Sequence, residues 1–96
     1  MHQIFITPSA KKEVKKLPKS VRIIALESSQ ELKNNPYLGE KLSGSLNFLY
    51  SFHFKVSGKD YRLVYTIDNK NKIIIIHLIQ IRENFYHKLT SSQYLQ

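Results

Sequence analysis

Hydrophobic residues in this chain follow a helical spacing first and a strand spacing later. Between residues 8 and 35 apolar side chains recur every three or four positions, which predicts two amphipathic helices separated at Pro18. The second helix should stop near Asn35, because a proline follows and disfavours helical backbone in the residue before it. A short strand over residues 3–7 precedes the helices, and Thr7 followed by proline is typical of a helix N-cap.

After a loop over residues 35–47, apolar and polar residues alternate, which predicts strands. The first strand runs from Phe48 to Val56, and one of its faces should pack while the other faces water. The side expected to face water carries Leu49, Ser51, His53 and Lys55.

Two more strands should complete an antiparallel meander. Ser57-Gly58 predicts a hairpin turn into a strand over residues 59–67, and residues 68–71 predict a second turn. Residues 72–81 are apolar on both faces, which predicts a central strand. A short helix or turn should follow from Arg82 to about Leu89.

The predicted fold is therefore α+β in the order β-α-α-β-β-β-α, with the helical hairpin packed on one face of the meander. The 96 residues fit one domain over 1–96 and leave no room for a second core. The polar tail over 90–96 should be frayed.

Charge narrows the choice of partners. Fifteen Lys and Arg against seven Asp and Glu give a net charge of +8 and a pI near 9.8, which favours a polyanionic partner such as RNA, DNA or an acidic protein. A basic surface that only keeps the protein soluble is the alternative. The chain has no Cys, no signal-peptide pattern and no apolar run near the about 20 residues that span a bilayer, so we expect a soluble cytoplasmic protein without membrane contact.

Several chemistries lack their parts in the sequence. The histidines form no HxxxH pair and Cys is absent, so a zinc site is not expected. Paired carboxylates within the meander and a Gly-rich phosphate loop are also missing, so we expect no metal and no cofactor. His77 lies inside the apolar strand, where a hydrogen-bonded core histidine is the simpler interpretation.

The remaining candidates are basic and aromatic residues expected at one end of the sheet. They are His53, Lys55, Arg62, Arg82 and Tyr86. Such a group suits RNA cleavage without a metal: a base takes a proton from the ribose 2′-OH, cations hold the phosphate, and an acid protonates the leaving oxygen. Each residue also has a structural alternative, as a solvent-facing strand residue, an ion-pair partner or core packing.

The segment 41–89 resembles the RelE/ParE toxin superfamily, nearer its RelE branch. The matching motifs are Lys41-Leu42-Ser43-Gly44, Leu49-Tyr50, Ser57 to Tyr65 and Ile81 to Tyr86. The most specific are the tyrosine-arginine-aliphatic-aliphatic-tyrosine run at 61–65 and the arginine-x-x-x-tyrosine run at 82–86. The predicted opening strand and helical hairpin agree with the family's layout.

The resemblance implies a toxin of a type II toxin–antitoxin system. Such a toxin would cleave mRNA in the ribosomal A site and would be held in a hetero-oligomer by a wrapping antitoxin. The resemblance places Arg62 on the family's phosphate-binding arginine and Arg82 on its second catalytic arginine. It places Tyr86 on the tyrosine that stacks on or orients a base.

The sequence departs from the family pattern on the strand after the loop. Ser51 and His53 stand where lysine or arginine is common, whereas Lys55 keeps its charge. His53 is therefore the candidate general base, with Lys55 as the competitor. Two other functions stay open: a ParE-like poison of DNA gyrase, and a catalytically weakened relative that binds RNA or protein. Retention of the two arginines and Tyr86 favours the nuclease.

Overall fold

The computed structural model describes residues 1–81 and has two α-helices, two short 3-10 helices and five strands in that part of the chain. The elements are β1 (Gln3–Ile6), α1 (Pro8–Lys15), α2 (Lys19–Asn34), η1 (Pro36–Leu38), β2 (Glu40–Lys41), η2 (Gly44–Leu46), β3 (Tyr50–Val56), β4 (Lys59–Asp68) and β5 (Ile73–Ile81). The expected order of the larger elements is confirmed up to β5. The helix or turn and the tail expected after residue 81 lie outside the described residues.

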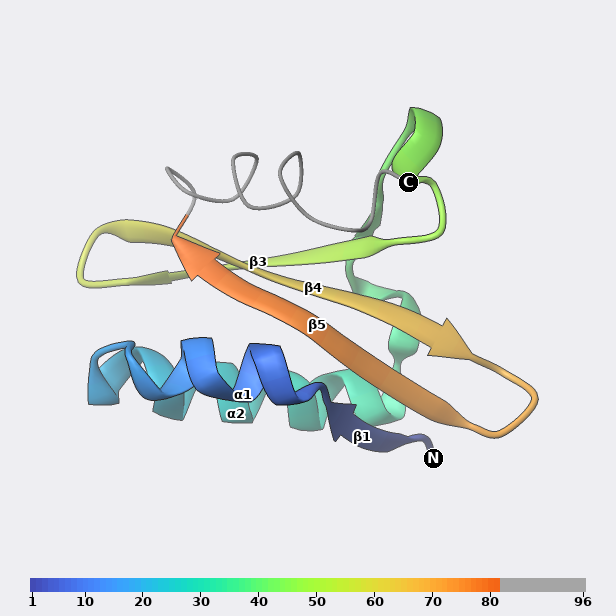
Figure 1. Ribbon diagram of the computed structural model, residues 1–96, viewed down its shortest axis with the longest axis horizontal. Coiled ribbons are helices and arrows are strands. Elements are labelled where there is room, and N and C mark those ends of the chain that lie inside the picture. The colour runs from blue at the N-terminus through green and yellow to red at the C-terminus, as the bar shows by residue number, and fades with distance from the viewer. Residues whose placement is uncertain (82–96) are drawn as a thin grey trace.

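The five strands form one mixed sheet in the order β1-β5-β4-β3-β2. Strands β3, β4 and β5 make the expected antiparallel meander, and β1 pairs in parallel with β5. The apolar pattern on both faces of β5 fits its interior place between β1 and β4, although β4 is the middle strand. Helices α1 and α2 lie together on one side of the meander (Figure 1).

The helices begin and end where local chemistry requires. Thr7 caps α1, because its hydroxyl oxygen accepts a hydrogen bond of 3.2 Å from the backbone N–H of Ala10. Asn35 ends α2 in extended backbone just before Pro36. Neither helix in the described part is long and apolar enough to cross a membrane.

The main core lies between α2 and the sheet. Its fully buried members are Ala25, Leu32, Leu63, Tyr65, Ile74, Ile76 and Ile79. Phe52 and Phe54 of β3 pack against this core, so the aromatic side of that strand is the packed side, as its alternation predicts.

Tyr65 fixes the loop between α2 and β3 to the core. Its hydroxyl donates a hydrogen bond of 2.6 Å to the carbonyl of Pro36 and accepts one of 3.0 Å from the N–H of Gly39. Burial raises the pKa of Tyr65, so the hydroxyl keeps the proton it donates. A Cβ on Gly39 would lie 2.7 Å from that hydroxyl oxygen, which is why this close approach requires glycine.

The expectation that one face of the strand from Phe48 to Val56 is exposed to water is wrong near the N-terminal end of β3. Leu49 and Ser51 are buried rather than solvent-facing, with 0% and 1% of their surfaces exposed, and Phe48 lies outside the strand and is exposed. The reason is a second apolar cluster on that face of the sheet, which consists of Leu42, Leu46, Leu49, Val64 and Leu78. The segment 42–49 folds across Ser51 and covers the face there.

Candidate functional site

The candidate site lies on the face of β3, β4 and β5 opposite the main core, and at the β5 end this face is reached by helix α1. We call this the distal face. It carries the side chains that alternate with the core residues of these strands, namely His53, Lys55, Asp60, Arg62 and Gln80.

Three of these residues form a row across the strands, which we call the distal row. In the strand register His53 pairs with Arg62, and Arg62 pairs with Gln80. Side chains opposite each other on antiparallel strands have Cβ atoms about 5 Å apart. His53 is exposed, Arg62 is half-buried and Gln80 is buried. An imidazole and a guanidinium are thus neighbours on a surface that a ligand can reach.

The two-residue turn after β3 sets this register. Ser57 and Gly58 both have positive φ, of 52° and 78°, as the tight turns of two-residue hairpins require. Val56 then pairs with Lys59, and counting back along both strands brings His53 opposite Arg62. The sequence alone therefore contains the reason for the pairing.

Lys55 lies one step closer to the turn, opposite Asp60. Its Nζ is 3.8 Å from the Asp60 Oδ1, and both side chains are largely exposed. Ion pairs this exposed contribute little to stability, so the ammonium stays available to an anion. The nearby Asp60 carboxylate nevertheless offsets part of the positive charge that Lys55 contributes to the distal face.

Gln80 links the distal row to the first helix, a contact that sequence reasoning missed. Its Nε2 donates a hydrogen bond of 2.8 Å to the Glu13 Oε2 on α1. The two residues are 67 positions apart, and no periodicity relates them. The only signal in the sequence is one amide within the otherwise apolar end of β5.

Arg82 and Tyr86 lie outside the described residues, so their positions relative to the row stay a prediction. Within residues 1–81 the structure has no group of three or more His, Asp or Glu side chains placed to share a metal ion.

His77 lies away from the distal row, at a bulge where the register between β4 and β5 shifts. Its Nε2 is 2.9 Å from the hydroxyl oxygen of Thr66. Burial lowers the pKa of His77, which favours the neutral ring. The hydrogen-bonded part of the expectation for His77 is confirmed, but the ring is half-buried and belongs to neither of the two core clusters.

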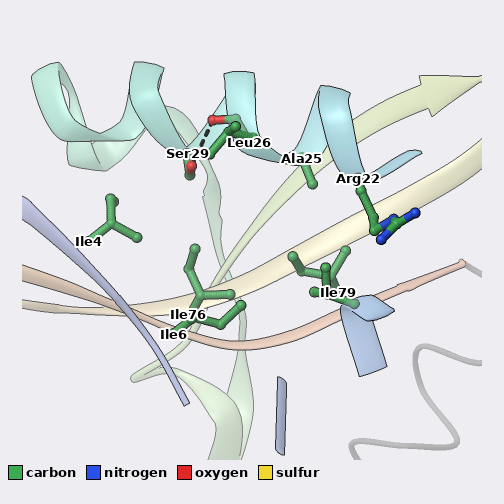
Figure 2. A pocket seen from close by; sticks show the side chains of 9 residues that line it. Ile4, Ile6, Arg22, Ala25, Leu26, Ser29, Ile76 and Ile79 are labelled. Atoms are coloured by element: carbon green, nitrogen blue, oxygen red, sulfur yellow. Dashed lines mark hydrogen bonds between the residues drawn. The ribbon is translucent and has the colours of Figure 1, made fainter. Parts of the chain in front are cut away.

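A cavity of about 170 Å³ opens on the opposite side of the sheet, between α2 and strands β1 and β5 (Figure 2). It is lined by Ile4, Ile6, Val14, Arg22, Ala25, Leu26, Ser29, Ile76 and Ile79. Ser29 uses its hydroxyl to donate to the Leu26 carbonyl at 2.7 Å. The lining offers apolar surface and a single cation, so the cavity lacks the base and the anion-binding group that the distal row combines.

The solved structures with a similar fold include bacterial and archaeal toxins. The toxin–antitoxin complex RelBE2 from Mycobacterium tuberculosis matches with a TM-score of 0.76 and 24% identity over 84% of this chain and 98% of that chain. The isolated E. coli RelE toxin matches with a TM-score of 0.73 and 24% identity over 94% of this chain and 96% of that chain. The RelE–RelB complex from Pyrococcus horikoshii matches with a TM-score of 0.63 and 26% identity over 84% of this chain and 94% of that chain.

The sequence itself identifies the family. No curated protein matches it significantly. The family model described as "ParE-like toxin of type II bacterial toxin-antitoxin system" matches residues 4–90, which is most of the chain. The match includes both helices and, apart from Gln3 at the start of β1, the five strands of the described part. The protein therefore belongs to the ParE-like toxins of type II bacterial toxin–antitoxin systems, within the RelE/ParE superfamily.

Proposed function

We propose that this toxin is a metal-independent endoribonuclease that cuts mRNA in the ribosomal A site and so stops translation in the cytoplasm. The observation that carries the proposal is the pairing of His53 with Arg62 on the distal face. A base and a phosphate-binding cation are the two groups that cleavage by the RNA's own 2′-hydroxyl needs first.

The proposed reaction is a transphosphorylation. His53 accepts the proton of the ribose 2′-hydroxyl, and the oxygen attacks the adjacent phosphorus. Arg62 holds two phosphate oxygens with its planar guanidinium and stabilises the charge that builds on them. The bond to the 5′-oxygen of the next nucleotide breaks as that oxygen takes up a proton. The products are a 2′,3′-cyclic phosphate and a free 5′-hydroxyl.

Arg82 and Tyr86 complete the proposal through the family resemblance. Arg82 would stabilise the charge on the phosphate or the leaving oxygen. Tyr86 would stack on a base and orient it, since a phenol with a pKa near 10 is a poor base at neutral pH but a possible proton donor.

An antitoxin is the expected protein partner. The structures from Mycobacterium tuberculosis and Pyrococcus horikoshii are both toxin–antitoxin complexes. We propose that an acidic or amphipathic segment of this toxin's antitoxin covers the distal face or displaces the chain after β5, because the toxin carries a charge of +8. An antitoxin that contacts only the helical side would contradict the proposal that it covers the distal face directly. Inhibition would then have to act through a change in the toxin's conformation.

Gyrase poisoning is the second candidate. The matching family model is described as ParE-like, and buried Ser51 replaces one cation of the RelE pattern. Both features are compatible with a toxin that acts without cutting RNA.

One experiment separates the candidates. Purified toxin is added to a reconstituted translation reaction, and in parallel to gyrase with supercoiled DNA. Cuts in mRNA at the A-site codon support the nuclease. Gyrase-linked DNA breaks without mRNA cuts would support the poison, and neither product would indicate a catalytically weakened binding module.

A further inference from the structure

Helix α1 carries a dense group of lysines that the proposed cleavage does not use. Lys11, Lys12 and Lys15 of α1 and its C-cap residue Lys16 are all exposed, and Glu13 is the single acid of α1. The 76% exposure of the Lys16 side chain leaves its ammonium accessible even though it lies 4.0 Å from the Glu13 carboxylate.

This arrangement is unfavourable for the helix taken alone. Lys11 and Lys15, and likewise Lys12 and Lys16, stand four positions apart and are therefore neighbours on the helix surface. Each like-charged pair destabilises an isolated helix by a few tenths of a kcal/mol. Alternating signs would give an equally soluble helix without that cost, so the lysines are better explained by an anionic ligand.

The four lysines fall on two flanks of α1. The helix buries Ala10 and packs Val14 against the core, which defines its inner side. With 3.6 residues per turn, Glu13 lies at one border of that side, and it is this border that meets Gln80. Lys16 lies about 60° further around the helix from Glu13, and Lys12 lies about 40° beyond it, on the outermost line of the helix. We call these two the near lysines. The far lysines, Lys11 and Lys15, follow from the opposite border.

Lys16 is next to the end of the distal row, because it follows Glu13 around the helix, and Lys12 stands beside Lys16 on the outermost line of the helix. Arg62 pairs with Gln80 in the sheet, and Gln80 donates a hydrogen bond to Glu13. The candidate site is therefore connected to α1 on the side of the helix that carries Glu13. The far lysines have the same charge on the same helix but lie on the side of α1 away from the contact between Glu13 and Gln80.

We propose that the near lysines Lys12 and Lys16 bind backbone phosphates of the RNA strand that crosses the distal face, next to the phosphate held by Arg62. The inference extends the proposed nuclease, because it assigns a path to the RNA substrate. Lysines spaced along one side of a helix suit a phosphate backbone, which is bound by dispersed cations and needs no base-specific contact.

A protein ligand fits this flank less well. Stable protein interfaces are anchored by buried aromatic or apolar side chains near their centre. The outward positions of α1 are lysines, and the exposed apolar residues of the hairpin, Ile23 and Leu26, belong to α2. An antitoxin segment held by the near lysines alone would lack such an anchor.

The test compares two double variants with equal charge loss. Binding of an RNA oligonucleotide with 2′-O-methyl riboses, which lacks the attacking hydroxyl, is measured by fluorescence anisotropy across a salt series. The full-length proteins are the parent, Lys12→Gln/Lys16→Gln and Lys11→Gln/Lys15→Gln. Circular dichroism and thermal unfolding check that each folds; removing like-charged pairs should not lower the melting temperature.

We expect the near double variant to bind more weakly and to lose about 1.4 from the slope of log Kobs against log salt, since each single-strand phosphate contact contributes about 0.7. The far double variant should change both quantities by less than half as much. Equal losses of RNA binding in the two variants would overturn the proposal and indicate diffuse attraction. Unchanged RNA binding in the near variant would also overturn it, whether or not antitoxin binding is weaker. Because the RNA cannot be cut, a near-to-far difference would stand even if the toxin failed to cleave mRNA.

Discussion

At the scale of single residues, the distal row places the imidazole of His53 opposite the guanidinium of Arg62. In the proposed cleavage the imidazole accepts a proton and the guanidinium holds the phosphate.

Replacing His53 by alanine should slow cleavage by a factor on the order of 10² to 10⁴, the usual effect of losing a general base. Single-turnover cleavage measures the rate. Lys55→Ala is the matched variant, and a loss of this size in Lys55→Ala together with an unchanged rate in His53→Ala would assign the base to Lys55 instead.

Ser51 gives a second test at this scale. Its hydroxyl oxygen is buried and has no hydrogen-bond partner in the described structure. Ser51→Ala should leave the free energy of unfolding unchanged or raise it by about 1 kcal/mol, because it removes an unsatisfied polar group. Ser51→Lys, which restores the family's charge, should destabilise the protein. Urea denaturation of both variants decides, and a clear loss of stability in Ser51→Ala would mean that the hydroxyl is satisfied.

At the scale of elements, the loop between α2 and β3 is held by one phenol. Tyr65→Phe removes the hydrogen bonds to the Pro36 carbonyl and the Gly39 N–H and should lower the free energy of unfolding by about 1–3 kcal/mol. Tyr37→Phe is the control, because its hydroxyl accepts one exposed bond of 2.8 Å from Asn69. Equal effects of the two substitutions in urea denaturation would contradict the anchoring role of Tyr65.

The bulge between β4 and β5 makes stability depend on pH. Burial lowers the pKa of His77 below its ordinary 6.5, so below that pH the unfolded chain binds a proton that the folded chain resists. The free energy of unfolding should therefore fall as the pH drops below about 6.5, and His77→Gln should reduce that fall. Denaturation midpoints of the parent and of His77→Gln, measured at several values between about pH 5 and about pH 8, compare the two pH dependences. Identical pH dependence in parent and variant would show that His77 is not the cause.

The larger elements could be predicted from the sequence because their periodicity follows burial on one face. The helical spacing up to Asn35 and the alternation in β3 are such patterns. The parallel pairing of β1 with β5 and the fold of segment 42–49 over Ser51 could not, because both depend on contacts between distant segments. No local propensity encodes such contacts.

The candidate site divides in the same way. His53 and Arg62 could be placed opposite each other from a two-residue turn and strand alternation. The bond from Gln80 to Glu13 could not, since it joins a strand to a helix 67 positions away.

At the scale of the whole molecule, part of the net charge of +8 lies in two regions: the distal face has Lys55 and Arg62, and the segment from α1 to its C-cap has four lysines. The two regions meet where Glu13 contacts β5, so a single polyanion can engage both. A charged surface alone would bind RNA without cutting it, and the proposed chemistry at Arg62 would separate this toxin from a simple RNA-binding domain.

The most direct test of that chemistry is the identity of the mRNA ends produced in a reconstituted translation reaction. The parent toxin should give fragments with a 2′,3′-cyclic phosphate and a 5′-hydroxyl, and Arg62→Ala, folded by circular dichroism, should lower their rate of formation by a factor on the order of 10² to 10³. Absence of fragments with the parent, fragments with 5′-phosphate ends, or an Arg62→Ala variant as fast as the parent would contradict the proposed cleavage.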